Sequence, residues 1–297
     1  MLKLSMLTWK SLLNRKLSVG LTVASIALSV ALLLGVERIR KDVQASFLNT
    51  VSGTDLIVGA RTSSLRLLLS SVFRVGDASN NMAWESFQML EDHPAVEWAI
   101  PVSLGDSHRG YRVLGTSGAY YDHFRYGRKQ KLETRQGTWI GSDREAVIGA
   151  EVAEALGYKT GDQLVVAHGA GEVGFIEHDE HPFTITGILH ATGTPVDRTV
   201  HVDLSGIDAI HAELETTACD HSLDPLHVRA HGHGEAGPSI TAAFVGLKTR
   251  SAALGIQRTV NEFEGEALSA LLTEINETVL KRRLTFHRAD GRSLTVD

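Results

Sequence analysis

Residues 17–36 read LSVGLTVASIALSVALLLGV, an apolar run without a charged side chain. A helix of about 20 apolar residues spans the roughly 30 Å hydrocarbon core of a bilayer. No second run of this kind occurs in the rest of the sequence. The sequence therefore predicts one membrane-spanning helix followed by a large polar domain.

The charges on the two sides of this run predict its orientation. The basic residues before it have no acidic residue among them, and they are Lys3, Lys10, Arg15 and Lys16. Acidic and basic residues alternate in residues 37–42, on the other side. Because cytoplasmic flanks carry an excess of Lys and Arg, we expect a cytoplasmic N-terminus and a main domain across the membrane.

The alternative to a retained anchor is a cleaved signal peptide, which also has a basic start and an apolar middle. Here the segment before the run is long, and Glu37-Arg38-Ile39-Arg40 stands where small residues would precede a cleavage site. We therefore expect the anchor to be retained. Apolar residues at helical spacing before the run predict a helix that lies in the membrane interface.

Beyond the membrane, the patterns predict an α+β fold in two subdomains. Residues 60–83 read as an irregular connection between a short strand and a helix over residues 84–93. The predicted divisions are a cytoplasmic interfacial helix (1–16), a transmembrane helix (17–36), a stalk with the first part of an α+β subdomain (37–116), an inserted β-rich subdomain (117–222), the second part of the α+β subdomain (223–265) and an atypical C-terminal tail (266–297).

Several classes of function are excluded by the composition and motifs. The net charge of -6 comes without a basic stripe, which argues against nucleic acid as a partner. The single cysteine, Cys219, excludes an intrachain disulfide. A G-x-x-x-x-G-K-[ST] motif is absent, so any ATP is bound by a partner subunit.

Two further motifs have the residue types for chemistry but the wrong surroundings. Residues 232–237 match G-x-G-x-x-G, yet Pro238 and a β-type pattern follow where a nucleotide-binding helix should begin. Ser107 and His108 lack the G-x-S-x-G elbow of a serine hydrolase. We expect no catalytic residues and no enzyme activity in this chain.

Histidine is the unusual component, because ten of the fourteen histidines lie between His168 and His233. Two local groups combine imidazoles with carboxylates, which are good ligands for zinc. The predicted metal ligands are His178, His181, His231 and His233. The alternative is a solvated polar loop, and the other histidines leave open a response to pH between about 5 and 7.

Five segments in order along the chain resemble a MacB/FtsX-type ABC transporter permease. They are residues 14–16 (NRK), 53–59 (GTDLIVG), 139–152 (WIGSDREAVIGAEV), 157–164 (GYKTGDQL) and 187–198 (GILHATGTPVDR). The resemblance implies a transmembrane helix, a periplasmic core of two subdomains and three further transmembrane helices. It also implies a homodimer in the inner membrane that transmits conformational change to and from a cytoplasmic ABC ATPase.

The C-terminal part departs from this family, because residues 281–297 contain no apolar run for the later membrane helices. We expect either a truncated or frameshifted copy or a remainder that lies on another chain. The leading hypothesis is a permease subunit that contacts the ATPase, its own second copy and a periplasmic adaptor or binding protein. The alternative is a membrane-anchored periplasmic metal-binding or sensing module, and a third hypothesis is a decayed gene product.

Overall fold

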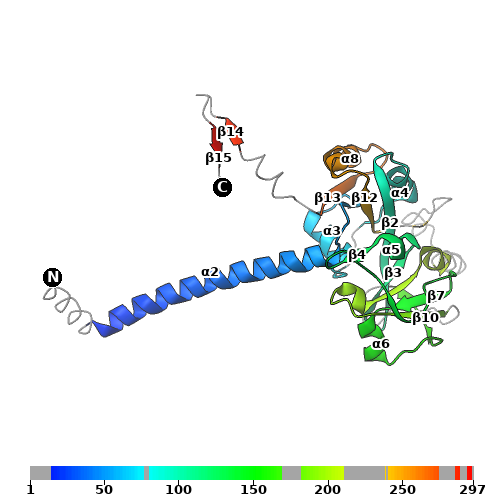
Figure 1. Ribbon diagram of the computed structural model, residues 1–297, viewed down its shortest axis with the longest axis horizontal. Coiled ribbons are helices and arrows are strands. Elements are labelled where there is room, and N and C mark those ends of the chain that lie inside the picture. Colours follow the sequence, from blue (N-terminus) through cyan, green and yellow to red (C-terminus); the bar gives the residue numbers. More distant parts are fainter. Residues whose placement is uncertain are drawn as a thin grey trace, which may run out of the picture. The chain divides into compact units, whose positions relative to one another are not determined.

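The computed structural model describes residues 15–76, 80–168, 182–210, 238, 240–273, 285–287 and 293–295. The chain divides into two units, Met1–Phe47 and Leu48–Asp297. The first unit consists, where it is described, of most of one helix, and the second contains the sheet and the remaining helices (Figure 1).

Helix α2 (Lys16–Thr50) contains the predicted membrane span and continues beyond it without a break. Among the described residues, its segment Lys16–Lys41 is the one helical stretch long and apolar enough to cross a membrane. Large apolar side chains along this segment are exposed, with Leu21 at 72% and Leu33 at 70%. Exposure of so many apolar side chains is unfavourable in water and suits contact with lipid.

The second unit is built around an eleven-stranded mixed sheet. The neighbouring strands follow the order β13, β1, β12, β2, β3, β11, β7, β10 and β6, while β8 pairs with β10 and β9 pairs with β2. The bounds are β1 (Leu56–Ala60), β2 (Val96–His108), β3 (Tyr111–Thr116), β6 (Thr134–Gly137), β7 (Glu145–Ile148), β8 (Gln163–Leu164), β9 (Ala167–His168), β10 (Phe183–Leu189), β11 (Thr199–Asp203), β12 (Ala242–Leu247) and β13 (Leu268–Leu272).

Short helices and two small hairpins complete this unit. The helices are α3 (Ser64–Ser71), α4 (Trp84–Glu91), α5 (Ala119–His123), α6 (Ala150–Leu156), α8 (Ala253–Asn261), the 3-10 helices η1 (Pro195–Arg198) and η3 (Arg250–Ala252), and a helical segment over residues 204–210. The hairpins pair β4 (Arg125–Tyr126) with β5 (Gln130–Lys131), and β14 (Thr285–His287) with β15 (Ser293–Thr295).

The first hydrophobic core lies between strands β1, β2, β12 and β13 and the helices α4 and α8. Phe87 and Leu90 of α4 and Ile256 and Val260 of α8 are buried in it. The elements come from both ends of the second unit, because β12, α8 and β13 follow the whole second core in the chain. This arrangement confirms the predicted α+β fold.

The second core is formed by β3, β7, β10 and β11 with α6 and the helical segment 204–210. Strands β7 and β10 run parallel, and so do β3 and β11. Gly157 ends α6 in the left-handed conformation, with a φ of 71°, as expected for a glycine C-cap.

Strand β2 belongs to both halves of the sheet. Its residues Val96–Val102 pair with β12, and its residues Ser103–His108 pair with β3. The pairing register with β3 shifts between Leu104 and Ser107. One continuous strand therefore connects the two cores.

The structure adds three features to the sequence prediction. The irregular connection predicted over residues 60–83 contains α3, whose first turn is capped by the Ser63 hydroxyl that accepts from Arg66 N. Residues assigned to the tail include β13, which forms the sheet edge beside β1. Two short strands, β8 and β9, follow one another closely in the chain and pair with different partners.

Glu266 supplies a cap to α4 from a distant part of the sequence. The N-cap residue of this helix, Ala83, has no side chain that can accept a hydrogen bond. The Glu266 carboxylate accepts from Ala83 N at 3.1 Å and from the Ser86 hydroxyl at 2.6 Å. These bonds join α4 to the residues that enter β13.

We predict that Glu266→Ala lowers the free energy of unfolding by about 1 kcal/mol, the usual cost of losing a helix cap. The measurement is chemical denaturation of the detergent-solubilised chain. Glu264→Ala is the matched control, because Glu264 is exposed and is expected to leave stability unchanged. Equal stability of the two variants would contradict the capping role.

Candidate functional site

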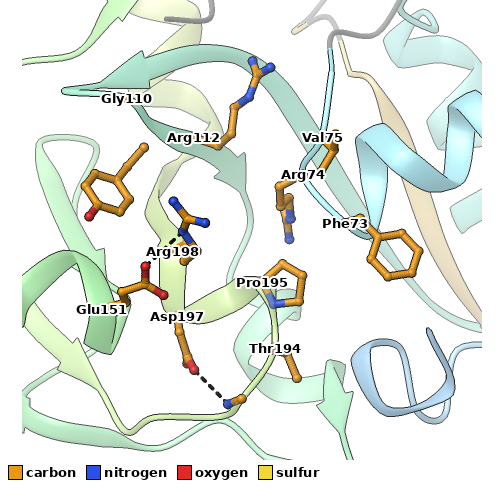
Figure 2. A pocket seen from close by; sticks show the side chains of 12 residues that line it. Phe73, Arg74, Val75, Gly110, Arg112, Glu151, Thr194, Pro195, Asp197 and Arg198 are labelled. Carbon is orange, nitrogen blue, oxygen red and sulfur yellow. Dashed lines mark hydrogen bonds and ion pairs between the residues drawn. The ribbon is translucent and has the colours of Figure 1, made fainter. Parts of the chain in front are cut away.

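A pocket of about 590 Å³ opens where four segments of the second unit meet. Its lining comes from the end of α3, the turn between β2 and β3, α6, and the loop that contains η1 (Figure 2). The lining residues are Phe73, Arg74, Val75, Gly110, Tyr111, Arg112, Glu151, Gly193, Thr194, Pro195, Asp197 and Arg198. Pockets of this size hold small organic molecules.

The η1 loop is held in shape by Asp197. Its carboxylate accepts from Thr192 N, from the Thr192 hydroxyl and from Gly193 N, each at 2.8 Å. Gly149 permits the loop to lie close to α6, because a Cβ at this position would be 2.3 Å from the Asp197 carbonyl oxygen. The carboxylate of Asp197 is thus engaged in hydrogen bonds within the η1 loop.

Arg198 and Arg112 place two guanidinium groups on the pocket wall. Arg198 Nε lies 3.1 Å from Glu151 Oε1, and its side chain is 66% exposed, so this ion pair is weak. Its guanidinium carbon also lies 5.9 Å from the Tyr111 ring centroid. Arg112 Nη2 donates to the Gly76 carbonyl oxygen at 2.9 Å.

Arg74 is the third arginine of the pocket and the most unusual. Its φ of 59° lies in the left-handed region that residues with a Cβ rarely adopt. Its Nη2 donates to the Tyr120 hydroxyl at 3.4 Å, whereas Nε and Nη1 are buried without a hydrogen-bond partner among the described residues. Burial lowers the pKa of Arg74, and the Tyr120 hydroxyl opposes that shift.

Behind Arg74, a row of aromatic rings crosses from the first half of the sheet to the second. Phe244 of β12 lies 6.3 Å from Phe124, which stacks on Tyr120 at 4.7 Å between centroids. Tyr120 in turn lies 5.4 Å from the His201 ring of β11. We call these four residues, Phe244, Phe124, Tyr120 and His201, the aromatic row.

The polar atoms of the aromatic row are largely sealed from water. Burial raises the pKa of Tyr120 to about 12, and burial likewise raises the pKa of Tyr121 well above its ordinary value. Burial, with the charge of Arg74, lowers the pKa of His201 to about 3. His201 Nδ1 lies 3.2 Å from the Val147 carbonyl oxygen, while its Nε2 has no partner within the described part of the chain. His201 therefore stays neutral between pH 5 and 7.

The four predicted metal ligands, His178, His181, His231 and His233, lie outside the described residues. The zinc site therefore stays a prediction. Within the described ranges, no group of three or more His, Cys, Asp or Glu side chains is arranged to hold a metal ion.

Ser107 and His108 are buried in β2. The two ring nitrogens of His108 lie 2.5 Å from the Val165 carbonyl oxygen and 2.9 Å from the Tyr158 hydroxyl. These contacts give His108 a structural role between β2 and the residues around β8.

The pocket arginines, Arg74, Arg112 and Arg198, were not singled out by the sequence, because they lie far apart in it and form no motif together.

The sheet and the helix before it define the class of this protein as an α+β domain preceded by a helix long and apolar enough to span a membrane. A family model described as the MacB-like periplasmic core domain matches residues 19–232, which is more than half of the chain. The chain therefore belongs to the MacB-like periplasmic core domain family, which occurs in permeases of ABC-type transporters.

Two solved structures align with this chain at low sequence identity. The periplasmic region of MacB from Actinobacillus actinomycetemcomitans aligns with a TM-score of 0.47 and 10% identity, over 79% of this chain and 94% of that chain. The extracellular domain of the noncanonic ABC-type transporter YknZ from Gram-positive bacteria aligns with a TM-score of 0.41 and 14% identity, over 73% and 98%. No curated protein matches this sequence.

The neutral state of His201 predicts a loss of stability in acid. The unfolded chain binds a proton at this residue below about pH 6.5, whereas the folded chain does so only near pH 3. The contribution of neutral His201 to the free energy of unfolding should therefore be fully present above pH 6.5. Below pH 6.5 and down to about pH 3, it should fall by about 1.4 kcal/mol per pH unit. His201→Gln should reduce this slope, measured by denaturation at several pH values.

The control for this experiment is His190→Gln, because His190 is exposed and should leave the slope unchanged. An unaltered slope in His201→Gln would show that other groups determine the acid sensitivity.

Zinc binding is predicted for the two histidine groups. Replacing His178, His181, His231 and His233 together by Ala should abolish binding of zinc measured by calorimetry at pH 7. Binding to the unchanged chain should weaken towards pH 5, since imidazole ligands must be deprotonated. His190→Ala is the control, and equal zinc affinity of all these chains would contradict the assignment.

Proposed function

We propose that this chain is a permease subunit of a MacB-type ABC transporter and couples a cytoplasmic ATPase to events in the periplasm. The family assignment supports the class of transporter. The observation that carries the coupling role is the continuity of α2 from the apolar segment to Thr50.

The length of α2 supports mechanical transmission. At about 1.5 Å per residue, a helix from Lys16 to Thr50 is about 50 Å long, whereas the hydrocarbon core needs about 30 Å. The helix therefore extends well beyond the membrane. Its last residue, Thr50, and the following Val51 are both buried in the second unit.

Asp55 fixes the chain that leaves α2 to several elements at once. Its carboxylate accepts from Leu247 N at 2.8 Å, and its backbone N–H donates to the Val245 carbonyl oxygen at 3.0 Å. Its own carbonyl accepts from Thr273 N at 3.1 Å. Arg250 adds an ion pair to its carboxylate at 3.8 Å. A displacement of the end of α2 would thus reach β1 and, through it, β12 and β13.

The orientation and partners follow from the same proposal. The basic residues before the span support an N-terminus in the cytoplasm, where the ATPase would bind, and a second unit in the periplasm. The working assembly contains a second copy of the chain, and a periplasmic adaptor or binding protein contacts the second unit. Arg15 and Lys16, both exposed, are the residues for which we propose contact with the ATPase.

The test is co-purification of an ABC ATPase with the tagged chain from its native membranes, followed by measurement of vanadate-sensitive ATP hydrolysis. Replacing Arg15 and Lys16 by Ala should reduce both by about tenfold, equivalent to about 1.4 kcal/mol of binding free energy. Lys41→Ala is the control, because Lys41 is an exposed cation at the opposite end of the apolar segment.

Unchanged recovery of the ATPase in the Arg15 and Lys16 double variant would contradict this contact. Absence of any ABC ATPase from the purified wild-type chain would contradict the proposed function itself.

A further inference from the structure

We propose that the pocket lined by Arg74, Arg112 and Arg198 binds a small organic oxyanion, a carboxylate or phosphate that carries an apolar group. The three arginines come from three separate segments and line the same space (Figure 2). This inference is independent of the ATPase partner.

The charge balance of the pocket favours an anion. Its two carboxylates are already engaged, since Asp197 accepts hydrogen bonds within the η1 loop and Glu151 pairs with Arg198. Within the described part of the chain, the guanidinium of Arg74 donates to the neutral Tyr120 hydroxyl and pairs with no carboxylate. An arginine remains ionised in proteins, so Arg74 brings beside the pocket a positive charge that no described carboxylate balances.

The burial of Arg74 makes this charge costly in the absence of an anion. Its Nε and Nη1 have lost water and have no hydrogen-bond partner among the residues described. Taking a charged group out of water without a partner is strongly unfavourable. An oxyanion offers the two acceptor atoms that match a guanidinium, and it would relieve this cost.

Access to the guanidinium requires a rotation of the Arg74 side chain. Arg74 itself lies outside the strands, so this rotation changes no strand pairing. The proposed binding therefore includes movement of the guanidinium from the Tyr120 hydroxyl into the pocket.

The apolar part of the ligand is inferred from the remaining lining. Phe73, Val75, Tyr111 and Pro195 contribute carbon surface to the same pocket. Together with a volume of about 590 Å³, this surface exceeds the needs of an inorganic ion. A ligand that fills the pocket would also connect the segment after α3 to the η1 loop.

The experiment measures binding of phenylacetate and phenyl phosphate to the full chain in phosphatidylcholine nanodiscs by saturation-transfer NMR. At least one of these anions should bind, and the preference between them identifies the oxyanion. The neutral phenylacetamide tests the need for charge, and inorganic phosphate tests the need for the apolar group. Both should bind at least tenfold more weakly.

Arg74→Met should weaken binding of the preferred anion by tenfold or more, without lowering the midpoint of thermal unfolding. The midpoint should hold because removal of a buried charge without a carboxylate partner offsets the loss of the hydrogen bond to Tyr120. Arg66→Met is the matched control, since Arg66 is an exposed arginine on α3 outside the pocket, and it should leave binding unchanged.

Arg198→Met provides a second test at an exposed position, and it should also weaken binding. This variant tests the proposal even if Arg74→Met fails to fold. The proposal is overturned if neither anion binds, if phenylacetamide binds as well as phenylacetate, or if both arginine variants retain the wild-type affinity.

Discussion

The backbone hydrogen bonding of β2 is the constraint on which the second unit depends. Its residues Val96–Val102 complete the sheet of the first core, and Ser103–His108 begin the sheet of the second. Backbone groups buried in a sheet must keep their partners, because an unpaired group costs about as much as a lost hydrogen bond. The two cores are therefore joined through one continuous strand, and the register shift after Leu104 gives that strand a local irregularity.

The join between the cores contains polar groups that a simple apolar core would avoid. Arg74, Tyr121 and His201 each have a buried polar atom without a partner in the described part of the chain. Such groups reduce stability, and they often occur at functional positions. The aromatic row supplies apolar contact beside them and so offsets part of their cost. The pocket lies next to this join, and one of its lining residues, Arg74, has polar atoms to which a ligand could hydrogen-bond.

The way in which α2 enters the second unit gives the anchor a direct connection to the sheet. Only a short segment separates Thr50 from β1, and Asp55 in that segment is bonded to residues of β12 and to Thr273, beside β13. Strand β1 lies between these two strands. Movement of the helix end is therefore opposed by hydrogen bonds from both the main chain and the side chain of Asp55.

Much of the fold could be predicted because its signals are local. The apolar run at residues 17–36, the strands β1, β7 and β10, and the glycine that ends α6 all depend on periodicity or on a single backbone preference. Helix α3 was missed because it is short and has serine residues at both ends, which favour turns and loops. Strand β13 was missed because its place is decided by pairing with β1, far away in the sequence.

The sequence by itself determined the membrane span, the α+β class and the family, since hydropathy, turn residues and ordered motifs act over short stretches of chain. Only the tertiary structure decided that Arg74, Arg112 and Arg198 share a pocket, and that His201 is too deeply buried to titrate near neutral pH. The physical reason is that desolvation and charge proximity depend on neighbours in space. Those neighbours are brought together by sheet pairing between residues far apart in the chain.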